Sequence, residues 1–189
     1  MDYINVAKER VASLCLHFGK ILDPHLGNTD DGTGKPISGA QLLWALAGRE
    51  SSFGKNCKPR YEPAYDYDGR YGHSHQQFDL LTEYGSDAAY SYGPWQIMLC
   101  NAIGYSPREL AHDPEKACVA TIGFIRRHIL EGQKAHTLEQ ISDSYNSGNY
   151  KDRVTDQVRQ YIEAVRHFYF TEVIDGPNVV LHDDEAGTA

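Results

Sequence analysis

The sequence predicts an all-α fold in a single domain, and two observations favour it. Apolar residues recur every three or four positions in several segments, and most of these segments begin at a residue that can cap a helix. No alternating run of apolar and polar residues is long enough for a strand of ordinary length. A chain of 189 residues, 41% of them hydrophobic, suits one globular domain. We expect that domain over residues 1–170 and an acidic, flexible tail over residues 171–189.

The first helix is expected over residues 3 to 18. Apolar side chains form one stripe along this segment, and Asp2 stands where an N-cap belongs. Residues 23 to 37 follow and are rich in Gly, Pro, Asp and Asn, which is typical of a loop.

The segment from Ser38 to Gly54 is predicted to be the helix around which the rest of the chain is organised. Ser38 and Gln41 have the spacing of a capping box, in which each residue caps the backbone N–H of the other. Gly54 suits the left-handed position that follows a helix.

Glu50 is the candidate catalytic residue of this helix. It falls on the same face as Leu43 and Ala47, near the helix C-terminus. Poor solvation and the negative end of the helix dipole both disfavour its carboxylate, so Glu50 is a candidate proton donor at neutral pH. The alternative is a frayed last turn that leaves Glu50 in water.

Residues 55 to 92 form a long, tyrosine-rich segment with little periodicity beyond a short helix near residues 76 to 84. A loop of this length inside a compact domain is usually functional, and tyrosines there suit a groove for sugars. The alternative is that the rings pack the loop onto the core. His73 and His75 lie near several aspartates, but solvated histidines are commoner than ligands, so no metal site is expected.

The second half of the chain is expected to hold four further helices. Ser106 and Thr137 each open a capping box, and Asp113 caps a long apolar helix that reaches about residue 130. The helix from Thr137 is expected to end near Ser144, and the last helix to cover residues 153 to 169.

The net charge of −8, without a basic cluster, argues against nucleic acid as the main partner. No apolar run approaches the ~20 residues of a membrane span, and the N-terminus does not have the pattern of a signal peptide. The four cysteines, which include no C-x-x-C pair, leave zero, one or two disulfides open. They are Cys15, Cys57, Cys100 and Cys118.

Three short fragments, in order along the chain, carry a resemblance to a known family. They are Glu50-Ser51-Ser52, Gly93-Pro94-Trp95-Gln96-Ile97 and Tyr145-Asn146-Ser147-Gly148. This order resembles the lytic transglycosylases, which have the lysozyme-like fold and are related to goose-type lysozyme. The resemblance covers about residues 38 to 169. Pro94-Trp95 replaces the family's usual Leu-Met, Ser147 replaces Ala, and residues 55 to 92 are longer than in the simplest members.

The resemblance implies cleavage of the β-1,4 bond between N-acetylmuramic acid and N-acetylglucosamine in peptidoglycan, with a 1,6-anhydro product and no cofactor. Glu50 would match the family's single catalytic carboxyl, which acts first as an acid and then as a base. The residues that would match substrate-binding positions are Ser51, Ser52, Gln96, Ile97, Tyr145 and Asn146. Tyr145 and Asn146 would hydrogen-bond the carboxyl and the substrate.

A hydrolytic muramidase or chitosanase-like enzyme on the same fold is the runner-up, and it usually needs a second carboxylate. The candidates in the long segment are Glu62, Asp66, Asp68 and Asp87. A non-catalytic wall-binding or structural module is the alternative of another class. The expected partner is the peptidoglycan glycan strand, with the protein a monomer. By resemblance, the expected setting is the cell envelope, the secreted fraction or a phage particle.

Overall fold

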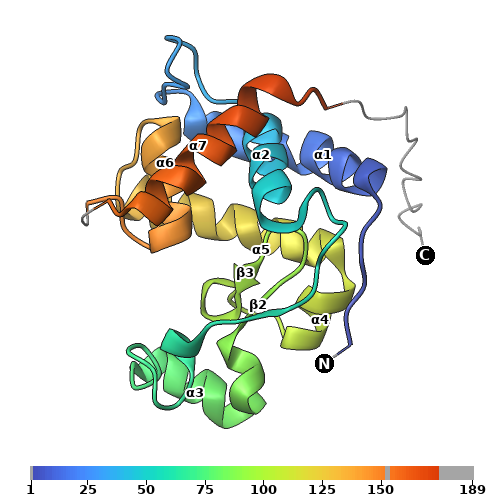
Figure 1. Ribbon diagram of the computed structural model, residues 1–189, viewed down its shortest axis with the longest axis vertical. Helices are drawn as coiled ribbons and strands as arrows, with labels where there is room; N and C mark the ends of the chain where they lie inside the picture. The colour runs from blue at the N-terminus through green and yellow to red at the C-terminus, as the bar shows by residue number, and fades with distance from the viewer. Residues whose placement is uncertain (1, 152–153, 175–189) are drawn as a thin grey trace, which may run out of the picture.

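The computed structural model describes residues 2–151 and 154–174 and is mostly helical (Figure 1). Its helices are α1 (Lys8–Leu26), α2 (Gly39–Ser51), α3 (His75–Tyr84), α4 (Pro107–His112), α5 (Pro114–Phe124), α6 (Leu138–Ser147) and α7 (Asp156–Thr171). The predicted tail begins where α7 ends, but residues 175–189 lie outside the described residues.

A small antiparallel sheet accompanies the helices and was not expected from the sequence. Its strands are β1 (Arg60–Tyr61), β2 (Tyr90–Tyr92) and β3 (Ile97–Met98), and β2 lies in the middle. Strands of two or three residues are too short to show an alternating pattern, so the sequence cannot reveal them.

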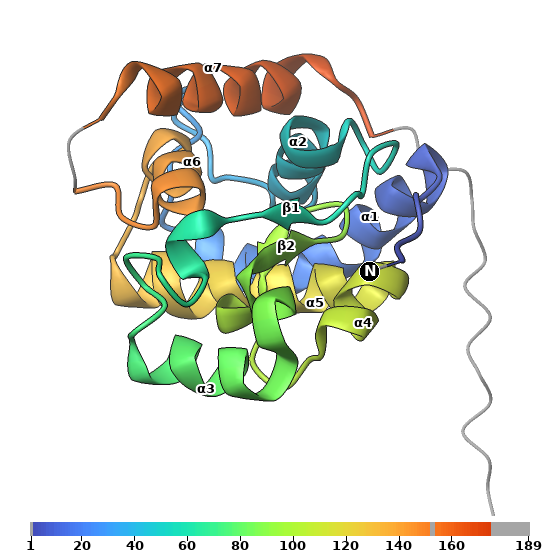
Figure 2. The ribbon, with the colours of Figure 1, turned by 60° about the horizontal axis from the view of Figure 1, so that its bottom comes forward.

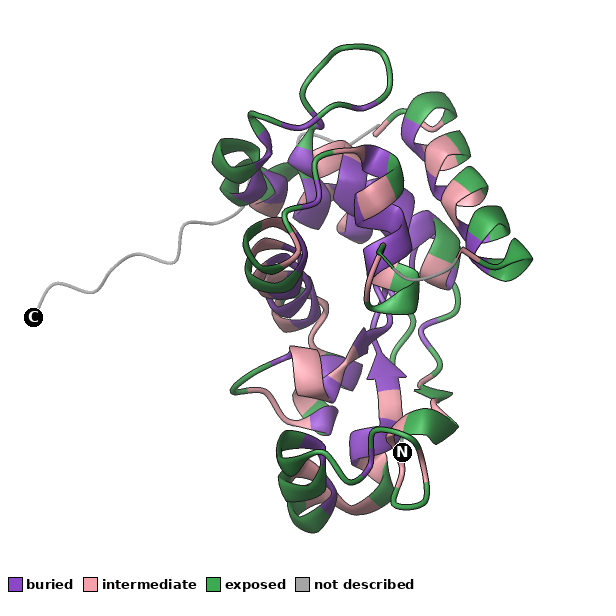
Figure 3. Ribbon diagram, turned by 90° about the vertical axis from the view of Figure 1, so that its left-hand side faces the viewer, coloured by how far each residue is buried: buried purple, intermediate pink, exposed green. Residues whose placement is uncertain are grey.

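Helix α2 lies at the centre of the helical part of the molecule. Nine of its 13 residues are buried, so it is covered on nearly every side. It packs against α1 and α7, and α6 packs against α7 (Figures 1 and 2). Figure 3 shows the buried residues gathered in the interior of the helices and along the strands. At the crossing of α1 and α2, Gly19 is required because a Cβ there would lie 2.3 Å from the backbone nitrogen of Ala40.

Helix α1 begins later and ends later than predicted. The segment before it is held extended by hydrogen bonds to distant backbone, since Val6 N–H donates to the Gly54 carbonyl at 2.9 Å. Asp2 therefore caps no helix, because the residue before α1 is Ala7. At the other end, the helix continues through Pro24 to Leu26, whose side chain is fully buried.

The predicted ends of α2 are confirmed in part. Ser38 Oγ accepts a hydrogen bond from the Gln41 backbone N–H. The Gln41 side chain does not complete the box, because its Nε2 donates to the carbonyls of Tyr169 (2.9 Å) and Glu172 (2.7 Å). The left-handed cap is Ser52, and Gly54 also has a positive φ.

The later helices follow the prediction with shifted ends. The capping boxes at Ser106 and Thr137 are both formed, and Asp113 caps α5. Helix α5 continues as a π-helix over Ile125–Gly132. Helix α6 passes the predicted end at Ser144 and reaches Ser147, and α7 begins at Asp156.

All four cysteines are free thiols in the structure. Within the described part of the chain, no helix has the length and apolar character needed to cross a membrane.

Candidate active site

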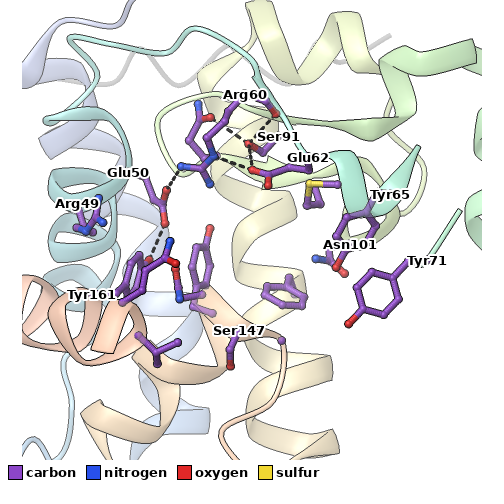
Figure 4. Close-up of a pocket in the computed structure, with 18 residues that line it drawn as sticks. Arg49, Glu50, Arg60, Glu62, Tyr65, Tyr71, Ser91, Asn101, Ser147 and Tyr161 are labelled. Carbon is purple, nitrogen blue, oxygen red and sulfur yellow. Dashed lines mark hydrogen bonds and ion pairs between the residues drawn. The ribbon is translucent and has the colours of Figure 1, made fainter. Parts of the chain in front are cut away.

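Glu50 lies in the last turn of α2, at the wall of a cleft of about 540 Å³ (Figure 4). Its side chain is only 5% exposed, although it borders the cleft. The last turn of α2 is intact through Ser51, so the alternative of a frayed helix end does not describe this structure.

Two side chains from other elements hold the Glu50 carboxyl. The Tyr161 hydroxyl, on α7, donates to Oε1 at 2.6 Å, and Arg60 Nη1, on β1, donates to Oε2 at 3.2 Å. Burial raises the pKa of Glu50 above its ordinary value, while Arg60, Tyr161 and Arg49 partly offset that rise. Glu50 is therefore a carboxyl that holds its proton more readily than one in water.

Arg60 bridges two carboxylates. Its Nε donates to Glu62 Oε1 at 2.6 Å while its Nη1 contacts Glu50, and its side chain is 53% exposed. Ser91 on β2 extends this polar chain, because its hydroxyl lies 3.4 Å from Glu62 Oε1 and donates to Gln96 Oε1 at 3.0 Å. Strand β1 and the residue after it thus place a cation and a second carboxylate in the same cleft as Glu50.

A tight turn from Gly93 to Gln96 joins β2 to β3 and forms part of the cleft. The Trp95 side chain is fully buried, and its Nε1 donates to the Leu43 carbonyl of α2 at 2.8 Å. Gly93 has a φ of 70°. A Cβ there would approach Ala117 to 2.8 Å. The Gln96 side chain lines the cleft but is held within the turn, since its Nε2 donates to the Gly93 carbonyl at 3.0 Å.

Tyr145 and Asn146, in the last turns of α6, both line the cleft. The Tyr145 hydroxyl donates to the Trp95 carbonyl at 2.7 Å rather than to Glu50, so its predicted contact with the carboxyl is wrong for this structure. That bond ties α6 to the turn that carries Gln96. The hydroxyl that contacts Glu50 is that of Tyr161 instead.

Other predicted site residues lie outside the cleft. Ser51 is buried, and its Oγ accepts from the Gly54 N–H at 2.8 Å, so it stabilises the end of α2. Ser52 is the exposed left-handed cap, and Ile97 is buried in β3. None of the three borders the cleft.

Of the candidate second carboxylates, Glu62 borders the cleft. Asp66 points elsewhere, since it accepts from the Tyr61 hydroxyl at 2.7 Å and from the Tyr67 N–H at 2.8 Å. Asp68 and Asp87 are also not among the residues that border this cleft.

Arg60, Tyr161 and Trp95 were not among the site residues expected from the sequence. Tyr161 lies within the last predicted helix, and the only local signal was a hydroxyl among aliphatic neighbours. Arg60 stood in a segment with no readable periodicity. Both reach Glu50 only through the tertiary fold.

The described residues contain no group of three or more His, Cys, Asp or Glu side chains placed to hold a metal ion. His75 instead pairs with Asp79 one turn later on α3, at 3.0 Å. Comparison of the chain with protein-family models, with curated proteins and with solved structures finds no match.

Proposed function

We propose that this protein cleaves the β-1,4 bond between N-acetylmuramic acid and N-acetylglucosamine in peptidoglycan, as a lytic transglycosylase with a lysozyme-like fold. One observation carries the proposal. Glu50 is a nearly fully buried carboxyl at the wall of an open cleft, and its pKa is raised by burial. A general acid needs this combination of access to substrate and a proton retained near neutral pH.

In the proposed reaction, Glu50 first donates its proton to the glycosidic oxygen as the bond from that oxygen to C1 of the muramic residue breaks. The resulting carboxylate then removes the proton from the C6 hydroxyl of the same sugar. The C6 oxygen closes onto C1, which gives the 1,6-anhydro ring without added water. Glu50 ends the cycle protonated, as it began.

Tyr161 and Arg60 suit the second half of this cycle. A hydroxyl at 2.6 Å and a guanidinium at 3.2 Å both stabilise the carboxylate that forms after the first proton transfer. Burial favours the protonated acid before transfer, so the site supports both states of Glu50.

Hydrolysis on the same fold is the second candidate, because Glu62 borders the same cleft as Glu50. A second carboxylate can activate water or stabilise the developing positive charge on the sugar. Arg60 Nε donates to Glu62 Oε1 at 2.6 Å, so one oxygen of this carboxylate is already engaged, which favours the intramolecular route.

Mass spectrometry of sugars released from purified peptidoglycan tests the proposal. We expect the wild-type products to end in an anhydro sugar, one water lighter than a hydrolysed reducing end, and Glu50→Gln to release almost none. Ordinary reducing ends would identify a hydrolase. No release by the wild type would favour a non-catalytic wall-binding module.

A further inference from the structure

A second pocket of about 300 Å³ adjoins the cleft, and we refer to it as the annex. The cleft and the annex share the residues Tyr65, Tyr71, Asn101, Phe124, Ser147 and Gly148. Figure 4 shows Tyr65, Tyr71 and Asn101 on the side of the cleft away from Glu50. The cavity next to Glu50 therefore continues past these residues, and a ligand longer than the cleft can extend into the annex.

Two aromatic pairs from separate parts of the chain contribute to the annex. Tyr65 and Tyr71 come from the tyrosine-rich segment, with ring centroids 4.9 Å apart. Phe124 and His128 come from α5 and the π-helix that follows, and their rings stack at 5.2 Å with a 16° angle. Aromatic rings offer flat apolar faces, and the Tyr and His edges add polar groups.

The annex differs from the cleft in charge. The cleft is bordered by Arg49, Glu50, Arg60 and Glu62. Among the described residues that border the annex there is no Asp, Glu, Lys or Arg, although the chain carries a net charge of −8. Burial raises the pKa of Tyr65 to about 12, so its hydroxyl stays neutral at physiological pH. The annex thus presents mainly rings, amides and hydroxyls.

Tyr65 and Tyr71 form one wall of the annex, and hydrogen bonds to their backbone hold this wall in place. Tyr71 N–H donates to the Ala64 carbonyl at 2.7 Å. The buried Gln77 side chain donates through Nε2 to the carbonyl of Tyr65 at 2.7 Å and to that of Ala88 at 3.2 Å. A wall fixed in this way needs little ordering when a ligand arrives.

We propose that the annex is a subsite for an uncharged N-acetylhexosamine ring of the same glycan strand, beyond the sugars that flank Glu50. This inference rests on the proposed function and adds a site whose aromatic rings lie outside the three fragments that carry the family resemblance, although Ser147 and Gly148 of the third fragment also border it. An acetamido sugar has an apolar ring face together with neutral hydroxyl and amide groups, which matches the annex. A stem peptide carries carboxylates, for which the annex offers no fixed cationic partner.

The test is calorimetric binding of N-acetylglucosamine oligomers, from dimer to hexamer, to the full chain carrying Glu50→Gln, which prevents turnover. We expect affinity to rise with oligomer length and Tyr71→Ala to remove most of that rise, with a loss of about tenfold for the hexamer and little for the dimer. Phe78→Ala is the matched control, because Phe78 is 51% exposed on α3 and borders neither the cleft nor the annex. His128→Ala tests the second aromatic pair, Phe124 and His128, by the same binding measurement.

Equal weakening of short and long oligomers in the Tyr71→Ala and His128→Ala variants would overturn the proposal, and so would unchanged binding of the hexamer. A stem tetrapeptide that binds the protein and loses affinity in these variants, while the sugars do not, would also overturn it. The proposed function fails separately: a protein that binds oligomers through the annex but cuts no glycosidic bond would retain the subsite and lose the reaction. A protein that cuts peptidoglycan but binds oligomers without this length dependence would retain the reaction and lose the subsite.

Discussion

The proton on Glu50 is subject to opposing influences. Burial disfavours the carboxylate, while Arg60, Tyr161 and Arg49 stabilise it. Tyr145 faces it from α6 as a neutral phenol, because burial raises the pKa of Tyr145 well above its ordinary value. Glu62 acts indirectly, since it shares the guanidinium of Arg60 with Glu50. The balance among these groups sets the pH range in which Glu50 can donate a proton.

Arg60→Gln and Glu62→Gln are expected to move the activity profile in opposite directions. Removing the Arg60 cation raises the pKa of Glu50, so the alkaline limb of kcat/KM moves to higher pH. Without the Glu62 carboxylate, Arg60 pairs only with Glu50. The pKa of Glu50 then falls, and the alkaline limb moves to lower pH. Steady-state rates on solubilised glycan strands across pH measure both shifts. Arg10→Gln is the control, because it breaks a surface ion pair with Glu115 that does not border the cleft.

If Arg60→Gln and Glu62→Gln both lost rate equally at every pH, and the alkaline limb of kcat/KM did not move, then Arg60 would contribute only to packing and would not set the pKa of Glu50.

Glu50→Gln is also expected to change how stability depends on pH. Because the folded protein raises the pKa of Glu50, the wild type is most stable, relative to this variant, below the unfolded value of about 4.3. It loses that advantage as pH rises through the folded pKa, whereas Gln has no proton to lose. Urea unfolding from acid to neutral pH should therefore show the difference shifting in favour of Glu50→Gln. A difference that stays constant with pH would contradict the raised pKa.

The sequence identified Glu50 because helical periodicity is local and puts this carboxyl on an apolar face. It could not identify Tyr161, which lies 111 residues away and meets Glu50 only when α7 packs on α2. The resemblance implied a hydrogen bond from Tyr145 to Glu50, whereas the Tyr145 hydroxyl donates to the Trp95 carbonyl.

At the scale of elements, the turn between β2 and β3 connects the helices that form the cleft. Trp95 contacts α2 through its indole N–H, and its carbonyl accepts the Tyr145 hydroxyl from α6. The turn therefore fixes the position of Gln96 relative to both helices.

Trp95→Phe is expected to destabilise the fold by about 1–2 kcal/mol, from the lost hydrogen bond and the space left by the smaller ring. Trp44→Phe is the matched control. Trp44 is equally buried, but its Nε1 has no hydrogen-bond partner among the described residues. Chemical denaturation of both variants should show the larger loss at Trp95. Equal losses would mean that the Trp95 hydrogen bond contributes little.

The N-terminal caps of the later helices were the feature that the sequence predicted best. The boxes at Ser106 and Thr137 depend on residues three positions apart, so they could be read from the sequence. The start of α1 could not, because Val6 is held extended by the backbone of Gly54. Strand β1 depends on a partner about 30 residues away, since Arg60 pairs with Ser91. Strands β2 and β3 are close in sequence, as Ser91 and Met98 show, but they are too short to have a readable pattern.

At the scale of the whole molecule, burial rather than covalent cross-links holds the fold together. Cys15, Cys57 and Cys118 are buried free thiols, and Cys100 is partly buried. The sequence left disulfides open because spacing along the chain does not determine which thiols meet.

Adding a reductant is expected to change Tm by less than about 1 °C, because there is no disulfide to break. Thermal unfolding with and without dithiothreitol measures this, and thiol titration of the denatured protein should count four free cysteines. A fall in Tm of about 5 °C or more would instead indicate a disulfide in solution.

The central claim is that one buried carboxyl performs the acid and base steps. The most direct measurement is the rate of glycosidic bond cleavage in purified peptidoglycan by wild type, Glu50→Gln and Glu62→Gln, each at its own optimal pH. We predict a loss of about 10²–10⁴-fold for Glu50→Gln and less than about tenfold for Glu62→Gln. A near wild-type rate for Glu50→Gln, or an equally large loss for Glu62→Gln, would contradict the claim.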